Sequence, residues 1–369
     1  MKAKKCPLFI MTIAALLLLA AAQIALPDRT VSQMESRTLS SAPKLSLESV
    51  LSSRFMSSCE SYIADQIPLR DAFVSAYAVY ESAQQKQLRN GVLIGENGYM
   101  FEMGKSISEK NIRENAEAFA EIARAAGASG YICVSPLSSS VYGEYVPRYA
   151  PIPDGYKLES AAKGDGITAI PLLKPLIAKK GGDALYYKTD HHWTAQGAYA
   201  AYSEICAAMG LENKNDGRYY EREGFSGSYF ARSPSPLQVS DTLTYFEASG
   251  TKLIIDGKET PEVNDSAALG GRDKYSGLLC GNHALIKLTN DNAGGVLFVL
   301  RDSYANALLP YLSQNFGTIY AVDARYYTGD IISEIRKSNA DALLCLYGIN
   351  TLGESRDLIT LAADALEEE

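Results

Sequence analysis

The chain has 369 residues, and its 43 acidic side chains outnumber its 35 basic ones to give a net charge of −8. A nucleic-acid binder needs a concentrated basic face, so this balance argues against a nucleic-acid partner. The composition is 47% apolar and 21% charged, which excludes wholesale disorder. Six scattered cysteines without a Cys-x-x-Cys pair give neither a zinc signature nor a small disulfide scaffold.

An almost wholly apolar run at residues 8–26 is about as long as a helix needs to be to cross a bilayer. Lys2, Lys4 and Lys5 precede this run, and such a bias places the N-terminus in the cytoplasm and the rest of the chain outside. Without these three lysines the remaining chain carries a charge of −11. We therefore predict a cytoplasmic tail and membrane anchor over residues 1–27. A cleaved signal peptide is the alternative, and it would yield a secreted protein.

The next part, residues 28–85, is predicted to be a tether and a helical lead-in. Residues 28–53 are rich in serine, proline and mixed charge and have little apolar periodicity, which is typical of an extended segment. Residues 55–87 have helical spacing of apolar side chains, and Pro68 should divide them into two helices.

The last part, residues 86–369, alternates predicted strands and helices near both of its ends. Strands are expected at 92–95, 98–101, 131–134, 185–187, 251–255, 296–300, 318–322 and 342–346, and helices at 111–126, 172–179, 195–209, 305–316, 330–338 and 352–366. Such alternation favours an α/β domain with a parallel sheet and helices on both faces. Residues 213–290 are predicted to be a loop-rich insertion with short β pieces.

The strongest local feature is the apolar strand at 296–300, which is followed by Arg301-Asp302-Ser303 and a helix. Ser303 would lie just beyond the carboxyl end of a parallel strand, where open α/β sheets place their ligands. It would also lie at a helix N-terminus, whose N–H groups and dipole favour developing negative charge. Ser303 is therefore a candidate nucleophile. The alternative is that Asp302 or Ser303 merely caps the helix.

A nucleophilic serine needs a general base, and the base needs a carboxylate that orients it. The chain has three histidines, and two of them are adjacent in the segment Thr189-Asp-His-His-Trp-Thr194. In extended backbone, Asp190 and His192 project to the same side, so Asp190 could hold one ring nitrogen of His192 while the other faces Ser303. His191 would then point away and be structural.

A metal site at Asp190, His191 and His192 is the competing interpretation of this segment. Adjacent side chains are expected to diverge, and no further histidine-rich segment completes a ligand set, so we predict no metal and no other cofactor. A satisfied pair of interior or surface histidines is the remaining alternative.

The Asp-His-His-Trp segment resembles the signature of the DHHW family of exported bacterial proteins, which is similar to the SGNH-like alginate O-acetylation proteins. Further stretches of residues 35–350 resemble the same proteins. These are Glu35-Ser-Arg-Thr-Leu39, Tyr62-Ile-Ala-Asp65 with Pro68-Leu-Arg70, Val92 to Phe101, Leu300-Arg-Asp-Ser-Tyr-Ala-Asn306 and Val322-Asp-Ala-Arg-Tyr326. Arg301 stands where a glycine is expected in the nucleophile block, and this departure affects the expected geometry of the turn.

The resemblance implies an SGNH-hydrolase-like domain in which Ser303 is the nucleophile, His192 the base and Asp190 the orienting acid. It also implies that Asn350 donates to the oxyanion, with a turn asparagine as the alternative. Arg325 would contact substrate or position its loop, with a surface salt bridge as the alternative.

The function implied is O-acetylation of a cell-surface or exported polysaccharide outside the cytoplasm. A membrane-bound O-acyltransferase is the implied partner, since it could pass acyl groups across the bilayer. Two other functions remain open: a carbohydrate acetyl esterase with the same mechanism, and a non-catalytic glycan-binding protein of the cell envelope.

Overall fold

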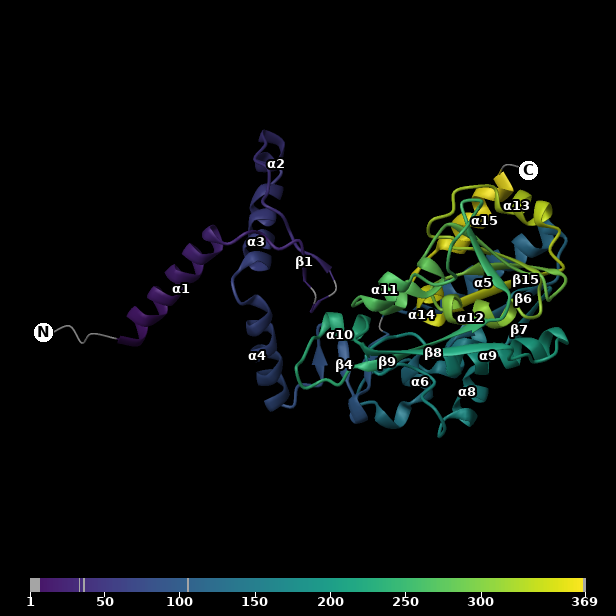
Figure 1. Ribbon diagram of the computed structural model, residues 1–369, viewed down its shortest axis with the longest axis horizontal. Helices are drawn as coiled ribbons and strands as arrows, with labels where there is room; N and C mark the ends of the chain where they lie inside the picture. Colours follow the sequence, from purple (N-terminus) through teal and green to yellow (C-terminus); the bar gives the residue numbers. More distant parts are fainter. Residues whose placement is uncertain (1–6, 33, 36, 105, 368–369) are drawn as a thin grey trace, which may run out of the picture. The chain divides into compact units, whose positions relative to one another are not determined.

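The computed structural model describes residues 7–32, 34, 35, 37–104 and 106–367 (Figure 1). The predicted cytoplasmic lysines Lys2, Lys4 and Lys5 lie outside the described residues. The chain divides into two compact units, Met1–Lys86 with Phe230–Gln238, and Gln87–Tyr229 with Val239–Glu369.

The first helix, α1 (Pro7–Ala25), has the properties of a membrane span. It has 19 residues, a mean hydropathy of 2.4 and no buried residue. An α-helix satisfies its own backbone hydrogen bonds, which is what a lipid environment demands. Among the described residues this is the one helix that is long and apolar enough to cross a membrane. Its position near the N-terminus suits either an anchor or a signal sequence.

Short strands and helices make up the rest of the first unit. They are β1 (Val31–Ser32), β2 (Arg37–Thr38), α2 (Leu47–Leu51), α3 (Arg54–Gln66) and α4 (Arg70–Ala83). The predicted division of the lead-in into two helices around Pro68 is confirmed. The tether is more ordered than its composition indicated, because β1 and β2 pair as an antiparallel hairpin.

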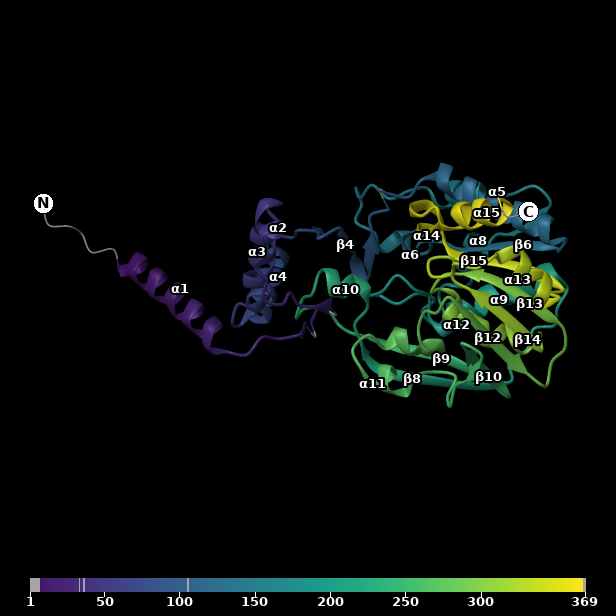
Figure 2. The ribbon, with the colours of Figure 1, turned by 90° about the horizontal axis from the view of Figure 1, so that it is seen from above.

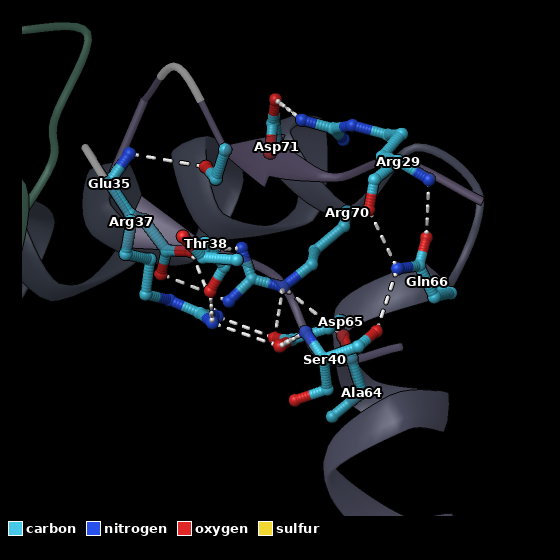
Figure 3. A network of polar contacts seen from close by, with 11 residues as sticks. Arg29, Glu35, Arg37, Thr38, Ser40, Ala64, Asp65, Gln66, Arg70 and Asp71 are labelled. Atoms are coloured by element: carbon cyan, nitrogen blue, oxygen red, sulfur yellow. Dashed lines mark hydrogen bonds and ion pairs between the residues drawn. The ribbon is translucent and has the colours of Figure 1, made fainter. Parts of the chain in front are cut away.

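Asp65 at the end of α3 is the centre of the polar network that holds the hairpin (Figure 3). Arg37 on β2 donates to both of its oxygens, at 2.9 and 2.5 Å, and the Ser40 N–H donates at 2.9 Å. Arg70 on α4 makes a second two-point pair with Glu35, at 2.5 and 2.9 Å. Planar guanidinium groups suit such bidentate pairs, so charge and geometry together fix the β1–β2 hairpin to the corner between α3 and α4.

The second unit is built around an eight-stranded sheet with the order β11-β10-β12-β14-β13-β15-β6-β7. Five neighbouring strands are parallel: β7 (Ile167–Ile170), β6 (Gly130–Ser135), β15 (Ala342–Gly348), β13 (Val296–Arg301) and β14 (Thr318–Val322). Three more extend the sheet in antiparallel fashion beyond β14: β12 (Leu285–Asn290), β10 (Thr251–Ile255) and β11 (Lys258–Glu259). The α/β prediction is confirmed, and the antiparallel extension comes from the segment that the sequence predicted as loop-rich.

Helices cover both faces of this sheet. Successive residues of its strands point to opposite faces, and in the central strands the residues on both faces are apolar. Leu297 and Val299 of β13 pack on one core and Phe298 and Leu300 on the other. The first core is shared with α8 (Leu173–Lys179), α9 (Ala195–Met209) and α12 (Ala305–Leu312). The second core is shared with α5 (Glu109–Ala126), α7 (Gly155–Ala161), α13 (Ile331–Ser338), α14 (Ile349–Glu354) and α15 (Asp357–Glu367). Figure 1 shows α13 and α15 above the strands and α8 and α9 below them, and Figure 2 shows the same unit from above.

Several shorter elements complete the second unit. They are the small sheet of β3 (Leu88–Arg89), β4 (Val92–Ile94) and β5 (Met100–Glu102), the helices α6 (Ser138–Val141) and α11 (Ser266–Gly270), and the 3-10 helix η3 (Lys274–Cys280). The helix α10 (Ser228–Arg232) has residues in both units.

Three predictions of local structure were wrong. Residues 185–187 form no strand, since Tyr186 makes a single bridge to Trp193. The expected last helix is two helices, α14 and α15. The insertion contains a long hairpin of β8 (Gly217–Phe225) and β9 (Asp241–Ala248). Most of β8 is exposed, so it lacks the apolar alternation from which a strand is predicted.

Candidate functional site

The turn that carries Ser303 follows the carboxyl end of β13, as the sequence predicted. Asp302, which is fully buried, fixes this turn by accepting from the Tyr304 N–H at 2.9 Å and from the Gly348 N–H at 2.8 Å. Asp302 therefore ties the start of α12 to the end of β15, and burial raises its pKa. The Ser303 hydroxyl takes no part in this capping and is directed at a histidine instead.

The structure brings the three predicted side chains together. His192 Nε2 lies 2.8 Å from Ser303 Oγ, and His192 Nδ1 lies 2.6 Å from Asp190 Oδ1. Asp190 is 3% exposed and His192 is 5% exposed, so both are shielded from water. A base within hydrogen-bond distance of a hydroxyl, itself held by a carboxylate, is the geometry required for activating a serine.

The contact between Asp190 and His192 has a different cause from the one predicted. The backbone there is a bend, not an extended strand, and Asp190 Oδ1 accepts from both the backbone N–H and the ring of His192. An aspartate that accepts from the N–H two residues on makes a compact turn. One oxygen thus fixes both the backbone and the ring of the histidine.

The second oxygen of Asp190 is held by a segment that no motif indicated. Ser228 donates its backbone N–H to Asp190 Oδ2 at 2.7 Å. The preceding residue is Gly227, and a Cβ there would lie 2.2 Å from Asp190 Cβ, so a glycine is needed for this close approach. Asp241 fixes the start of the histidine segment, because its carboxylate accepts from the N–H and the hydroxyl of Thr189, at 2.8 and 2.6 Å.

Asp190 remains ionised because its partners outweigh its burial. Burial alone would raise the pKa of this carboxyl, but His191 and His192 and the hydrogen bonds from the His192 ring and the Ser228 N–H hold it well below its usual range. A carboxylate that stays charged can orient the His192 ring and stabilise its protonated form.

Two hydrogen bonds connect the histidine segment to the serine turn across more than one hundred residues of sequence. Trp193 Nε1 donates to the Tyr304 carbonyl at 3.0 Å, and the Tyr304 hydroxyl donates to the His191 carbonyl at 2.8 Å. The Trp193 and Tyr304 rings also meet edge to face, and both side chains are buried. These contacts fix the distance between the base and the hydroxyl.

His191 does not point away, as the sequence analysis expected. Its ring lies against that of His192, with centroids 3.8 Å apart, and its Nδ1 lies 2.8 Å from Ser228 Oγ. Burial and the charge of His192 lower the pKa of His191 to about 4. At neutral pH it is therefore an uncharged neighbour of the proposed base.

The sequence analysis expected the adjacent side chains of Asp190, His191 and His192 to diverge. This expectation was wrong, because their potential ligand atoms lie within 4.8 Å of one another. Hydrogen bonds engage both ring nitrogens of His192, which face Asp190 and Ser303. This arrangement favours a hydrogen-bonded relay, and the absence of a metal stays a prediction.

Asn350 and Arg325 follow the two strands that flank β13. Asn350 Nδ2 lies 3.5 Å from Glu102 Oε2, and its Oδ1 is buried with no partner among the described residues. A Cβ at Gly348 would meet both Asn350 Oδ1 and the Tyr304 ring, which places the amide beside the serine turn. Arg325 pairs at two points with buried Asp323, which raises the pKa of Arg325. This ion pair fixes Arg325 within its own loop, and a contact of Arg325 with substrate stays a prediction.

Sequence reasoning missed three residues around the base: Ser228, Asp241 and Tyr275. Tyr275 stacks on the His192 ring with centroids 3.7 Å apart and planes 10° apart. All three lie within the segment predicted as a loop-rich insertion, residues 213–290, where no periodicity or motif marks individual side chains. Gly227 was the one available signal, because a glycine marks a possible close approach of backbone.

Two family models match overlapping parts of this chain. The model described as DHHW protein matches residues 172–322, and the model described as SGNH hydrolase-like domain, acetyltransferase AlgX, matches residues 92–228. The first range contains Asp190, His192 and Ser303. The resemblance predicted from the sequence motifs is therefore confirmed.

Curated relatives and solved structures agree with these matches. Probable alginate O-acetylase AlgJ of Pseudomonas fluorescens is 25% identical over 172 residues, which are 43% of this chain and 44% of that protein. The chain thus spans less than half of the length of the curated relatives that it matches.

Two solved structures share the fold. A DHHW family protein from Eubacterium siraeum matches with a TM-score of 0.61 and 20% identity, over 73% of this chain and 94% of that one. Bacillus cereus PatB1, solved with a sulfonyl adduct, matches with a TM-score of 0.60 and 17% identity, over 72% and 97% of the two chains.

Proposed function

We propose that this protein transfers O-acetyl groups to a polysaccharide outside the cytoplasm, with Ser303 as nucleophile, His192 as base and Asp190 as orienting acid. The observation that carries the proposal is the unbroken chain of contacts from Asp190 through His192 to the Ser303 hydroxyl. Similarity to an acetyltransferase domain and to a probable alginate O-acetylase supports acetyl transfer as the reaction.

In the first step, Ser303 Oγ attacks the carbonyl carbon of an acetyl donor while His192 Nε2 takes the hydroxyl proton. The tetrahedral intermediate then expels the donor's leaving group, which receives that proton, and leaves an acetyl ester on Ser303. In the second step, His192 takes the proton of a sugar hydroxyl, whose oxygen attacks the ester. Ser303 leaves with the proton, and the acetylated sugar is released.

The negative charge of each intermediate needs hydrogen-bond donors at a fixed place. The Ser303 N–H lies at the amino end of α12, where the helix dipole favours negative charge. We propose Asn350 as the side-chain donor, because it follows β15 and its Oδ1 already faces Gly348, so that a rotated carboxamide would direct Nδ2 to the serine turn. To donate to the intermediate, Asn350 Nδ2 would give up its 3.5 Å contact with Glu102 Oε2.

We propose that α1 anchors this reaction to the outer side of the cell membrane. The anchor would keep the site beside a membrane-bound O-acyltransferase that supplies the acyl group. The apolar length of α1 and the lysines before it support this orientation.

The test uses the full chain in detergent with p-nitrophenyl acetate as donor and a panel of oligosaccharides as acceptors. We expect sugar products heavier by one acetyl group, detected by mass spectrometry, and loss of this product by at least about 10³-fold in Ser303→Ala. Ser313→Ala is the matched control, because Ser313 is a buried serine at the opposite end of α12. It should keep the activity.

Three other results would contradict the proposal. Full activity in Ser303→Ala would exclude the serine mechanism. Acetate release that no acceptor sugar changes would identify an esterase instead. Saturable binding of a glycan together with no reaction of Ser303 toward a sulfonyl fluoride would identify a glycan-binding protein.

A further inference from the structure

Tyr275 contacts both the proposed base and the segment that carries the proposed nucleophile. It lies on η3, and its ring stacks almost parallel to the His192 imidazole, with centroids 3.7 Å apart. Its hydroxyl donates to the Ser303 backbone carbonyl at 3.1 Å. The side chain is 5% exposed, so both contacts are made in a water-poor environment.

The opposite side of the same imidazole is also occupied. The centroid of the His191 ring lies 3.8 Å from that of the His192 ring, at a tilt of 37°. The centroid of the Tyr304 ring lies 5.0 Å from that of the His192 ring. His191 is itself held by Ser228 through Nδ1. The imidazole therefore lies between two rings and has both nitrogens engaged, so it cannot rotate away from Ser303 unless Tyr275 or His191 moves.

We propose that Tyr275 is a positioning residue of the acyl-transfer site, which holds the His192 ring in line with Asp190 and Ser303 and fixes the serine turn through its hydroxyl. This inference rests on the function proposed above, and it assigns the insertion at residues 213–290 a part in the reaction. Tyr275 acts through His192 and Ser303 and not on the substrate.

The chemistry of the two rings supports this role. The imidazole becomes positively charged each time it accepts a proton, and the face of a phenol ring is electron-rich, so stacking stabilises that charged form. Burial raises the pKa of Tyr275 well above its usual value, so its hydroxyl keeps its proton and remains a donor to the Ser303 carbonyl. A phenylalanine would preserve the stack but lose this hydrogen bond, and a leucine would lose both.

The experiment compares Tyr275→Phe, Tyr275→Leu and Tyr245→Leu in the full chain in detergent, with p-nitrophenyl acetate as the acyl donor. Tyr245 is the matched control because it is also a buried tyrosine of the insertion and stacks on another ring, that of Tyr220. The readouts are kcat, KM, the rate at which a sulfonyl fluoride labels Ser303, and the melting temperature.

We expect Tyr275→Leu to lower kcat and the labelling rate by about 10- to 100-fold, since a loosened base loses part of the 10²- to 10⁴-fold contribution of general-base catalysis. KM should stay within about twofold, and Tyr275→Phe should restore kcat to within about threefold of the natural protein, because the stack is the main contact. Tyr245→Leu should lower the melting temperature by a similar amount and leave kcat within about threefold.

Two results would overturn the inference while the proposed function stands. These are a Tyr275→Leu protein whose kcat and labelling rate stay within about threefold, and equal losses in Tyr275→Leu and Tyr245→Leu, which would indicate a purely structural role. If the natural protein shows no reaction that depends on Ser303, the proposed function fails first and the inference fails with it.

Discussion

Asp65 in the lead-in and Asp190 in the α/β unit are both buried aspartates, but their hydrogen-bond partners differ in whether they can gain and lose a proton near neutral pH. Asp65 is 6% exposed and Asp190 is 3% exposed, and in both cases the partners hold the pKa of the carboxyl well below its usual range. The main partner of Asp65 is the Arg37 guanidinium. The main partner of Asp190 is an imidazole whose other nitrogen reaches the Ser303 hydroxyl.

This difference decides what each cluster can do. An arginine stays protonated at any physiological pH, so the Asp65 network is closed and can only hold segments together. A histidine gains and loses a proton near neutral pH, so the Asp190 network can pass a proton to and from a third group. A buried carboxylate with a lowered pKa therefore indicates a reactive site only when its partner can titrate and leads to another reactive atom.

Replacing the aspartate with asparagine in each cluster tests this difference, and the largest expected effect is the loss of acetyl transfer in Asp190→Asn. Asp190→Asn should keep the fold but lower acetyl transfer by about 10²- to 10⁴-fold, since an amide cannot stabilise the protonated His192 and favours the wrong tautomer. Acetyl transfer to an oligosaccharide and the melting temperature are the measurements. Activity within about threefold of the natural protein would show that Asp190 is structural, like Asp65.

Asp65→Asn should have the opposite pattern, with full activity and a loosened lead-in. Removing the charge weakens the contacts to Arg37 and Ser40, and because the Arg37 side chain is 40% exposed we expect a local cost of about 1–2 kcal/mol. Hydrogen exchange of the Ser40 amide, which donates to Asp65, measures this cost directly. An unchanged exchange rate, or a loss of acetyl transfer, would contradict the comparison.

The sequence predicted the site better than it predicted the surroundings of the site. Ser303, His192 and Asp190, which the structure brings together, could be named as candidates because a strand followed by a polar turn and a rare histidine pair are local signals. The same holds for α9, whose bounds follow from Thr194 and Gly210, the residues that cap its two ends.

The supporting residues were not predictable in the same way. Tyr275, Ser228 and Asp241 contact residues that are distant in sequence, so no local motif distinguishes these three side chains. The strand β8 is exposed on most of its length, so no apolar alternation predicts it. The bend at Asp190 was also missed, because a single carboxylate oxygen that binds both a backbone N–H and a ring leaves no trace in residue spacing.

The smallest expected effect is a loss of stability in mild acid that arises at His191. The Asp65 cluster should not contribute to it, because Asp65 changes stability only at lower pH. Burial lowers the pKa of His191 to about 4, so below the ordinary histidine pKa of about 6.5 the unfolded chain binds a proton that the folded chain does not. Stability should therefore fall as the pH drops from about 6.5 towards 4. The side chain is 26% exposed, so we expect a loss of about 1–2 kcal/mol.

His191→Asn isolates this contribution, because an amide can keep the contact with Ser228 Oγ but does not titrate. The melting temperature of the full chain should fall less between about pH 7.5 and pH 5 in this variant than in the natural protein. Asp65→Asn should leave that difference unchanged, since the stabilisation from a lowered aspartate pKa is lost only below about pH 4. Equal acid sensitivity of His191→Asn and the natural protein would contradict this prediction, because it would mean that folding does not lower the pKa of His191.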